Sequence, residues 1–131
     1  MTFSRLSGAL LAVVLSVVAT GLAVTGTASA NQTSYLSLAI ASPEGPVKVV
    51  NLECAPAGGN HPNPKAACAE LMAAQGDLNQ VGGDQTAACT MEYRPVTASA
   101  YGHWEGQPVA WDQEFPNNCT LATNTGTVFV F

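Results

Sequence analysis

Basic side chains and enzyme motifs are both scarce in this sequence of 131 residues. Lys and Arg together number 4, against 9 Asp and Glu. Nucleic acids and anionic membranes are bound mainly through clustered basic side chains, so we expect the mature protein to bind neither. The sequence also contains no nucleophile elbow, no metal-binding His pair and no phosphate-binding glycine loop. These absences leave few routes to catalysis.

No apolar run reaches the ~20 residues that a membrane-spanning helix requires, because Gly and Thr interrupt residues 21–27 and no basic stop-transfer segment follows. Arg5 instead precedes an apolar stretch at residues 10–24, and Ala28-Ser29-Ala30 is a small-residue cleavage site. This pattern is typical of a secretory signal peptide. We predict that residues 1–30 are removed and that residues 31–131 form one secreted, extracellular domain.

Four cysteines are present, at positions 54, 68, 89 and 119, and none forms a Cys-x-x-Cys pair. His61 completes no known zinc-finger spacing, so we predict no metal site. In an exported small domain an even number of cysteines favours disulfides, which supplement a small core. Three pairings are possible, and we expect Cys54 with Cys68 and Cys89 with Cys119, which closes the shortest loops.

One catalytic arrangement is not excluded by counting. Ser99 lies four positions before His103, so an extended strand would place both on one face, and Asp112 could lie across a hairpin from them. However, a disulfide-linked domain of ~100 residues rarely encloses an active-site cleft. We therefore predict that the protein is not an enzyme, has no catalytic residues and needs no cofactor.

Alternating and β-branched residues predict strands at residues 35–41, 47–54, 96–104, 108–115 and 126–131. Asn63 and Pro64 are typical of a helix N-cap and first helical position, and strong helix formers follow until Gly76. A single helical turn is predicted at residues 119–123, and residues 55–62 are too rich in Pro and Gly for regular structure. Five strands and one main helix predict an α+β layered domain.

The segment from Cys89 to Pro95 has features of a recognition loop. A disulfide at Cys89 would fix one side, while Tyr93 by packing and Pro95 by its restricted backbone would fix the other, so that Met91 is held out toward a protease specificity pocket. The competing interpretation is that Met91 is buried beside the disulfide, as Met and Cys usually are.

Short sequence motifs along the chain resemble those of the Streptomyces subtilisin inhibitor-like family, and the resemblance covers essentially residues 35–131. The motifs follow one another in the order of the family, with the four cysteines at matching places: Leu52-Glu53-Cys54-Ala55-Pro56, Gly59-Asn60-His61-Pro62, Ala67-Cys68-Ala69-Glu70-Leu71, Gly76-Asp77-Leu78-Asn79, Cys89-Thr90-Met91, Tyr93-Arg94-Pro95-Val96, Trp104-Glu105-Gly106, Asn118-Cys119 and residues 126–131.

The resemblance implies a five-stranded antiparallel sheet, sequential disulfides, a homodimer and inhibition of secreted serine proteases. It maps the reactive bond to Met91-Glu92, with a protease-contact loop that also includes Ala88, Cys89, Thr90, Tyr93, Arg94 and Pro95. The sequence departs from the family pattern at two positions: Arg94 stands where an acidic or amide residue is expected, and Pro116 where a small residue is expected.

Met91 suits the apolar pocket of subtilisin-like and chymotrypsin-like proteases and lacks the charge that a trypsin-like pocket requires. Glu92 could repel acidic protease surfaces, so we expect a narrow range of targets. The rival function is a non-inhibitory secreted binding module, such as a substrate or regulator of an extracellular cross-linking enzyme. Exposed glutamines would then matter more than Met91, namely Gln32, Gln80, Gln85 and Gln107.

Overall fold

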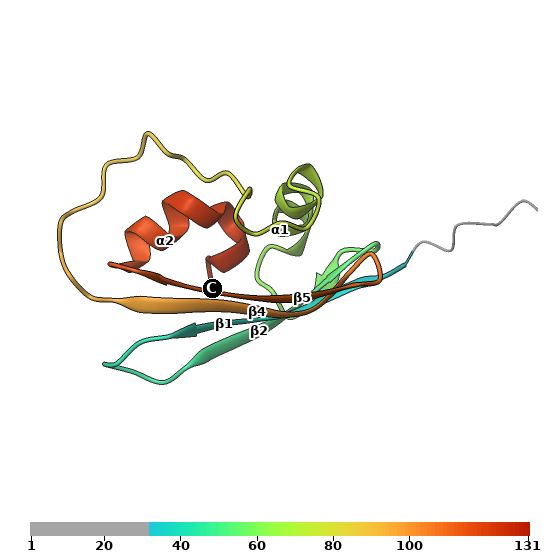
Figure 1. Cartoon of the computed structure of the whole chain (residues 1–131), viewed down its shortest axis with the longest axis horizontal. Coiled ribbons are helices and arrows are strands. Elements are labelled where there is room, and N and C mark those ends of the chain that lie inside the picture. Colours follow the sequence, from blue (N-terminus) through green and yellow to red (C-terminus); the bar gives the residue numbers. More distant parts are fainter. Residues whose placement is uncertain (1–31) are drawn as a thin grey trace, which may run out of the picture.

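A five-stranded antiparallel sheet forms one layer of the protein, and two helices lie over one of its faces (Figure 1). The computed structural model describes residues 32–131, so the predicted signal peptide lies outside the described residues. The strands are β1 (Ser34–Ala41), β2 (Lys48–Cys54), β3 (Gly58–Gly59), β4 (Val96–Trp104) and β5 (Gln107–Phe115), and they stand in the order β3-β2-β1-β4-β5.

Strand β1 occupies the middle of the sheet, and its sequence explains this position. Leu36, Leu38 and Ile40 are buried, while the residues between them point to the other face, which is the alternation of a strand with one covered side. The strand pairs antiparallel with β2 on one side and β4 on the other. The first four predicted strands are all confirmed.

Both helices cover the same face of the sheet (Figure 1). Helix α1 (Pro64–Ala73) has Asn63 at its N-cap, as predicted, and it buries Ala67, Cys68 and Leu71. Helix α2 (Asn118–Thr125) is longer than the single turn predicted at residues 119–123. The sheet, the two helices and two disulfides confirm the predicted α+β class.

The predicted strand at residues 126–131 is wrong. This segment folds back as the 3-10 helix η1 (Gly126–Phe129). Val128 and Phe129 are adjacent and both buried, which a strand with one covered face cannot achieve because its neighbouring side chains point to opposite sides. The alternation in the sequence therefore did not correspond to two faces of a sheet.

Strand β3 completes the sheet instead, and it comes from the segment that was predicted to be irregular. It pairs with Leu52 and Glu53 of β2. Gly59 makes this pairing possible, because its φ of +86° is unfavourable for other residues and a Cβ there would collide with the Asn51 carbonyl oxygen. The same glycines that suggested a loop thus allow the close approach of two backbones.

The two disulfides fasten the helical layer to the rest of the domain. Cys54 at the end of β2 is joined to Cys68 in α1, and Cys89 is joined to Cys119 in α2. This is the expected sequential pairing, and it leaves no cysteine free to ligate a metal. Among residues 32–131, no helix has the length and apolar character needed to cross a membrane.

Candidate functional site

Residues 88–95 form an exposed loop without helix or strand, immediately before β4. Met91 is fully exposed, with a relative accessibility of 101%, so the interpretation that it packs beside the disulfide is wrong. A side chain that contributes nothing to the core is available for contact with another molecule. The Cys89–Cys119 disulfide holds the chain to α2 two residues before it.

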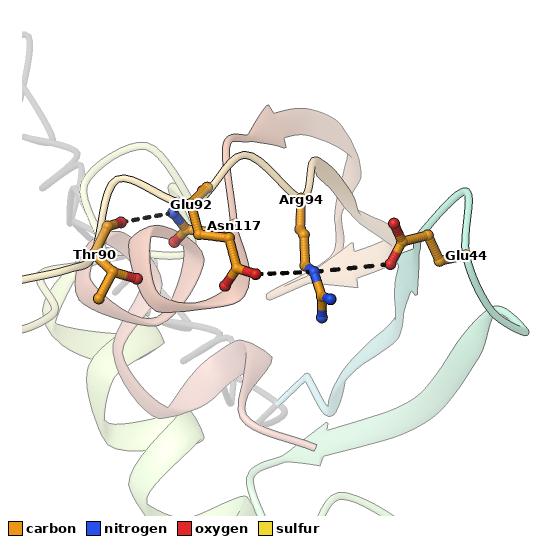
Figure 2. Close-up of polar contacts among 5 residues, drawn as sticks. All are labelled: Glu44, Thr90, Glu92, Arg94 and Asn117. Atoms are coloured by element: carbon orange, nitrogen blue, oxygen red, sulfur yellow. Dashed lines mark hydrogen bonds and ion pairs between the residues drawn. The ribbon is translucent and has the colours of Figure 1, made fainter.

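The side chain of Asn117 supports the loop on both sides of Met91 (Figure 2). Its Nδ2 donates hydrogen bonds to the carbonyl oxygens of Thr90 at 3.3 Å and Glu92 at 2.9 Å. Asn117 is only 8% exposed, and its Oδ1 accepts a hydrogen bond from the backbone N–H of Thr120 at 2.8 Å, which makes it the N-cap of α2. One buried amide therefore joins the loop to the start of a helix.

The far end of the loop is fixed through its backbone. The N–H of Arg94 donates to the backbone carbonyl oxygen of Pro116 at 2.8 Å, a bond that does not depend on which side chain stands at position 116. The ring of Pro95 fixes the φ angle of that residue, and Val96 is buried as the first residue of β4. Tyr93, which was expected to hold this end by packing, is 73% exposed, so that expectation is wrong.

A hollow of about 370 Å³ lies between the loop and the start of α2. It is lined mainly by the loop and the start of α2, through Cys89, Thr90, Met91, Glu92, Tyr93, Pro116, Asn117 and Thr120. The loop thus does not lie on a packed core. Its position depends on the disulfide and on hydrogen bonds to Asn117 and Pro116 rather than on burial.

The charged side chains of the loop are paired with each other (Figure 2). Arg94 Nε lies 3.1 Å from Glu92 Oε1 and 4.0 Å from Oε2 of Glu44, which belongs to the turn between β1 and β2. The departure from the family pattern at Arg94 therefore places a cation beside the acidic residue that follows Met91.

A polar turn precedes the loop. The Thr86 hydroxyl and the Thr86 backbone N–H both donate hydrogen bonds to the Asp84 carboxylate. These bonds lower the pKa of Asp84, the bond from the hydroxyl more than the bond from the N–H. Gln85 Nε2 donates to the Thr123 carbonyl oxygen at 2.9 Å. The four glutamines considered for the rival function, Gln32, Gln80, Gln85 and Gln107, are all exposed, and Gln85 is in addition held by this hydrogen bond.

The structure does not assemble the triad considered from the sequence. Ser99 pairs across the strands with Asp112, but His103 pairs with Pro108, four residues further along β4. Four residues of strand separate the two positions by about 13 Å, far beyond hydrogen-bond distance. The other histidine, His61, is buried, with Nε2 bonded to the Val128 carbonyl oxygen at 3.0 Å.

Two residues of the site were missed in the sequence. Asn117 had a signal, because an Asn at the start of a short helix favours an N-cap, and Cys119 two positions later was expected to bridge to the loop. Glu44 had no such signal, because only the folded sheet brings its turn close to Arg94.

These features define a class of protein: a small two-disulfide α+β domain that displays a loop tethered on both sides of an exposed apolar residue. A model of the family described as subtilisin inhibitor-like matches residues 32–117. The chain belongs to the subtilisin inhibitor-like family, whose members are protease inhibitors and not enzymes.

Individual relatives agree with this assignment. Subtilisin inhibitor-like protein 5 of Streptomyces fradiae is 49% identical over 87 residues, which are 66% of this chain and 81% of the relative. Subtilisin inhibitor-like protein 8 of Streptomyces virginiae is 46% identical over 88 residues, 65% of this chain and 79% of the relative. Sermetstatin of Streptomyces caespitosus, solved in complex with Bacillus licheniformis subtilisin, is 34% identical to this chain, with a TM-score of 0.64. The match covers 76% of this chain and 100% of the sermetstatin chain.

Proposed function

We propose that this protein is a secreted inhibitor of serine endopeptidases, chiefly subtilisin-like and also chymotrypsin-like, with Met91-Glu92 as its reactive bond. The observation that carries the proposal is a fully exposed Met91 between two carbonyl groups that are both held by the buried Asn117. The family and the complex of sermetstatin with subtilisin support it.

Rigidity explains how such a loop inhibits rather than serves as a good substrate. A flexible peptide loses conformational freedom when it binds, whereas a loop already fixed by a disulfide and by Asn117 loses little. The same contacts with the protease therefore yield a higher affinity.

The anchors also act after any cleavage. If the protease cuts between Met91 and Glu92, the Thr90 carbonyl and the Cys89–Cys119 disulfide hold the acyl side. The Glu92 carbonyl and the Arg94 N–H hold the side that carries the new amine. The amine stays close to the acyl group, so the bond re-forms readily and net hydrolysis is slow.

Met91 would occupy the primary specificity pocket of the protease. Its unbranched apolar side chain fits the pockets of subtilisin-like and chymotrypsin-like enzymes. A trypsin-like pocket would bury its carboxylate without a cationic partner, which disfavours that class of target.

The homodimer is part of the proposal. The helices cover only one face of the sheet, and the other face exposes Tyr35, Val49 and Tyr101 around small residues of β1 and β4. Exposed apolar groups that gather on one face are typical of an interface, and two identical faces can pair about a two-fold axis. The reactive loop lies on the helical side, so a dimer of this kind would leave it accessible.

Secretion is likewise proposed, from the signal-peptide pattern of residues 1–30 together with the two disulfides. Intact mass of the protein from culture medium tests it. The expected mass is that of residues 31–131 with four cysteines oxidised, and retention of Met1 would contradict the proposal.

A titration of subtilisin activity with the pure protein and a chromogenic substrate tests inhibition against its rivals. We expect activity to fall linearly with added protein to an equivalence point, as tight one-to-one binding requires. A protein that leaves subtilisin fully active would favour the binding module, and turnover of a substrate by the protein alone would favour an enzyme.

A further inference from the structure

The residue after the proposed reactive bond is acidic, and the structure gives it a partner within the loop. Glu92 Oε1 lies 3.1 Å from Arg94 Nε, so the two side chains form an ion pair. Side chains two positions apart on an extended chain point to the same side, so the pair can form without help from the remainder of the fold. Both residues stand in the segment that a protease would cover.

Arg94 is well placed to hold Glu92. Its backbone N–H is bonded to Pro116, and Pro95 follows it, so the start of its side chain is fixed. Its Nε also lies 4.0 Å from Glu44, which places the guanidinium between two carboxylates. Figure 2 shows the outer nitrogens of the guanidinium pointing away from both carboxylates.

The ion pair contributes little to the stability of the free protein, because the side chains of Arg94 and Glu92 are 64% and 57% exposed. A bound protease changes this situation. It excludes water, which strengthens the attraction, and it would otherwise have to cover an unpaired carboxylate beside the reactive bond. The effect of Arg94 should therefore be visible in protease binding rather than in folding.

We propose that Arg94 is a specificity-determining residue that acts by positioning and neutralising Glu92. With Arg94 in place, the inhibitor accepts serine proteases whose surface beyond the scissile bond is neutral or acidic. Without it, Glu92 repels an acidic surface and is costly to desolvate against a neutral one. This inference rests on the proposed function, since it requires Met91-Glu92 to be the bond presented to the protease.

A double-mutant cycle against subtilisin tests the inference. We expect Arg94→Gln to raise the inhibition constant about tenfold in the native background but less than about twofold when Glu92→Gln is also present, because the coupling of close charges is lost. Arg94→Lys keeps the positive charge and should keep most of the wild-type affinity. Added salt should bring the inhibition constant of Arg94→Gln closer to that of the wild type, because salt screens the charge of Glu92. Glu105→Gln, an exposed carboxylate in the turn between β4 and β5 at the other end of the sheet, is the matched control and should change inhibition less than about twofold.

Each outcome decides a separate question. If the wild type does not inhibit subtilisin, the proposed function fails and the inference fails with it. If the wild type inhibits, but Arg94→Gln has no effect or has the same effect with and without Glu92, only the inference is overturned. Melting temperatures within about 4 °C of the wild type show that the variants are folded, as expected for exposed side chains.

Discussion

Met91 and Asn117 have opposite environments and complementary roles in the proposed mechanism. Met91 is fully exposed and makes no contribution to the core, whereas Asn117 is buried and uses both ends of its amide. Substitution of the first should alter recognition, and substitution of the second should alter how rigidly the recognised bond is held.

Replacing Met91 should redirect the inhibitor without destabilising it. Met91→Gly should weaken subtilisin binding by ~2 to 4 kcal/mol, the scale of a central contact residue, and change the free energy of unfolding by less than ~1 kcal/mol. Met91→Lys should weaken chymotrypsin binding and create trypsin binding. Inhibition constants and melting curves of both variants check this.

Met72 provides the matched control for that prediction, because it is an exposed methionine on α1. Met72→Lys should leave protease preference unchanged. An unfolding cost of several kcal/mol for Met91→Gly with unaltered preference would refute Met91-Glu92 as the reactive bond.

Asn117 allows its two roles to be separated. Asn117→Ser keeps a good N-cap but is too short to reach the loop, whereas Asn117→Ala loses both functions. We expect both variants to be cleaved faster at Met91-Glu92 during incubation with subtilisin, and only Asn117→Ala to lose an additional ~1 kcal/mol from the missing cap. Mass spectrometry of the cleavage products and thermal melts measure the two effects, and an intact loop in both variants would contradict the role given to Asn117.

At the scale of elements, the long connection between α1 and β4 is joined covalently to the rest of the domain by one disulfide. The Cys54–Cys68 disulfide links β2 to α1, while Cys89–Cys119 links the loop around Met91 to α2. The two bridges should therefore differ in function although both stabilise the domain.

Removing the second bridge should impair inhibition more than removing the first. Each double-serine variant should lose roughly 3 to 4 kcal/mol of stability in the chain-entropy model. Only the Cys89→Ser/Cys119→Ser variant should show a large rise in the inhibition constant, measured at a temperature where both variants remain folded. An equal rise in both would remove the argument for a local anchor.

At the scale of the molecule, the sheet separates two surfaces. One face packs against the helices, and the other presents Tyr35, Val49 and Tyr101 to solvent. Inhibition and self-association are thus expected on separate parts of the domain.

A charged residue on the open face should break the proposed dimer without affecting inhibition. Tyr101→Glu would bury one unpaired charge from each protomer in the proposed interface, so we expect a monomer by sedimentation and an unchanged equivalence point in the subtilisin titration. Met72→Glu, on the helical layer, is the control and should remain dimeric. A monomeric wild type at high concentration would exclude the dimer.

The sequence by itself determined those features that rest on local patterns. The alternation of apolar and polar residues predicted β1, and Asn63-Pro64 predicted the start of α1. The order of the cysteines, together with the family motifs, predicted the disulfides and the loop around Met91. These signals work at short range, because strand alternation and helix capping depend on neighbouring residues.

Only the tertiary structure decided which segments meet across the chain. The bonds from Asn117 to Thr90 and Glu92 join residues 25 or more positions apart, and the contact of Glu44 with Arg94 depends on the order of the strands. The fifth strand was decided in the same way, because Gly59 could approach β2 while residues 126–131 had to bury two adjacent side chains. Local pattern sets what an element can be, whereas packing against distant residues selects its final place.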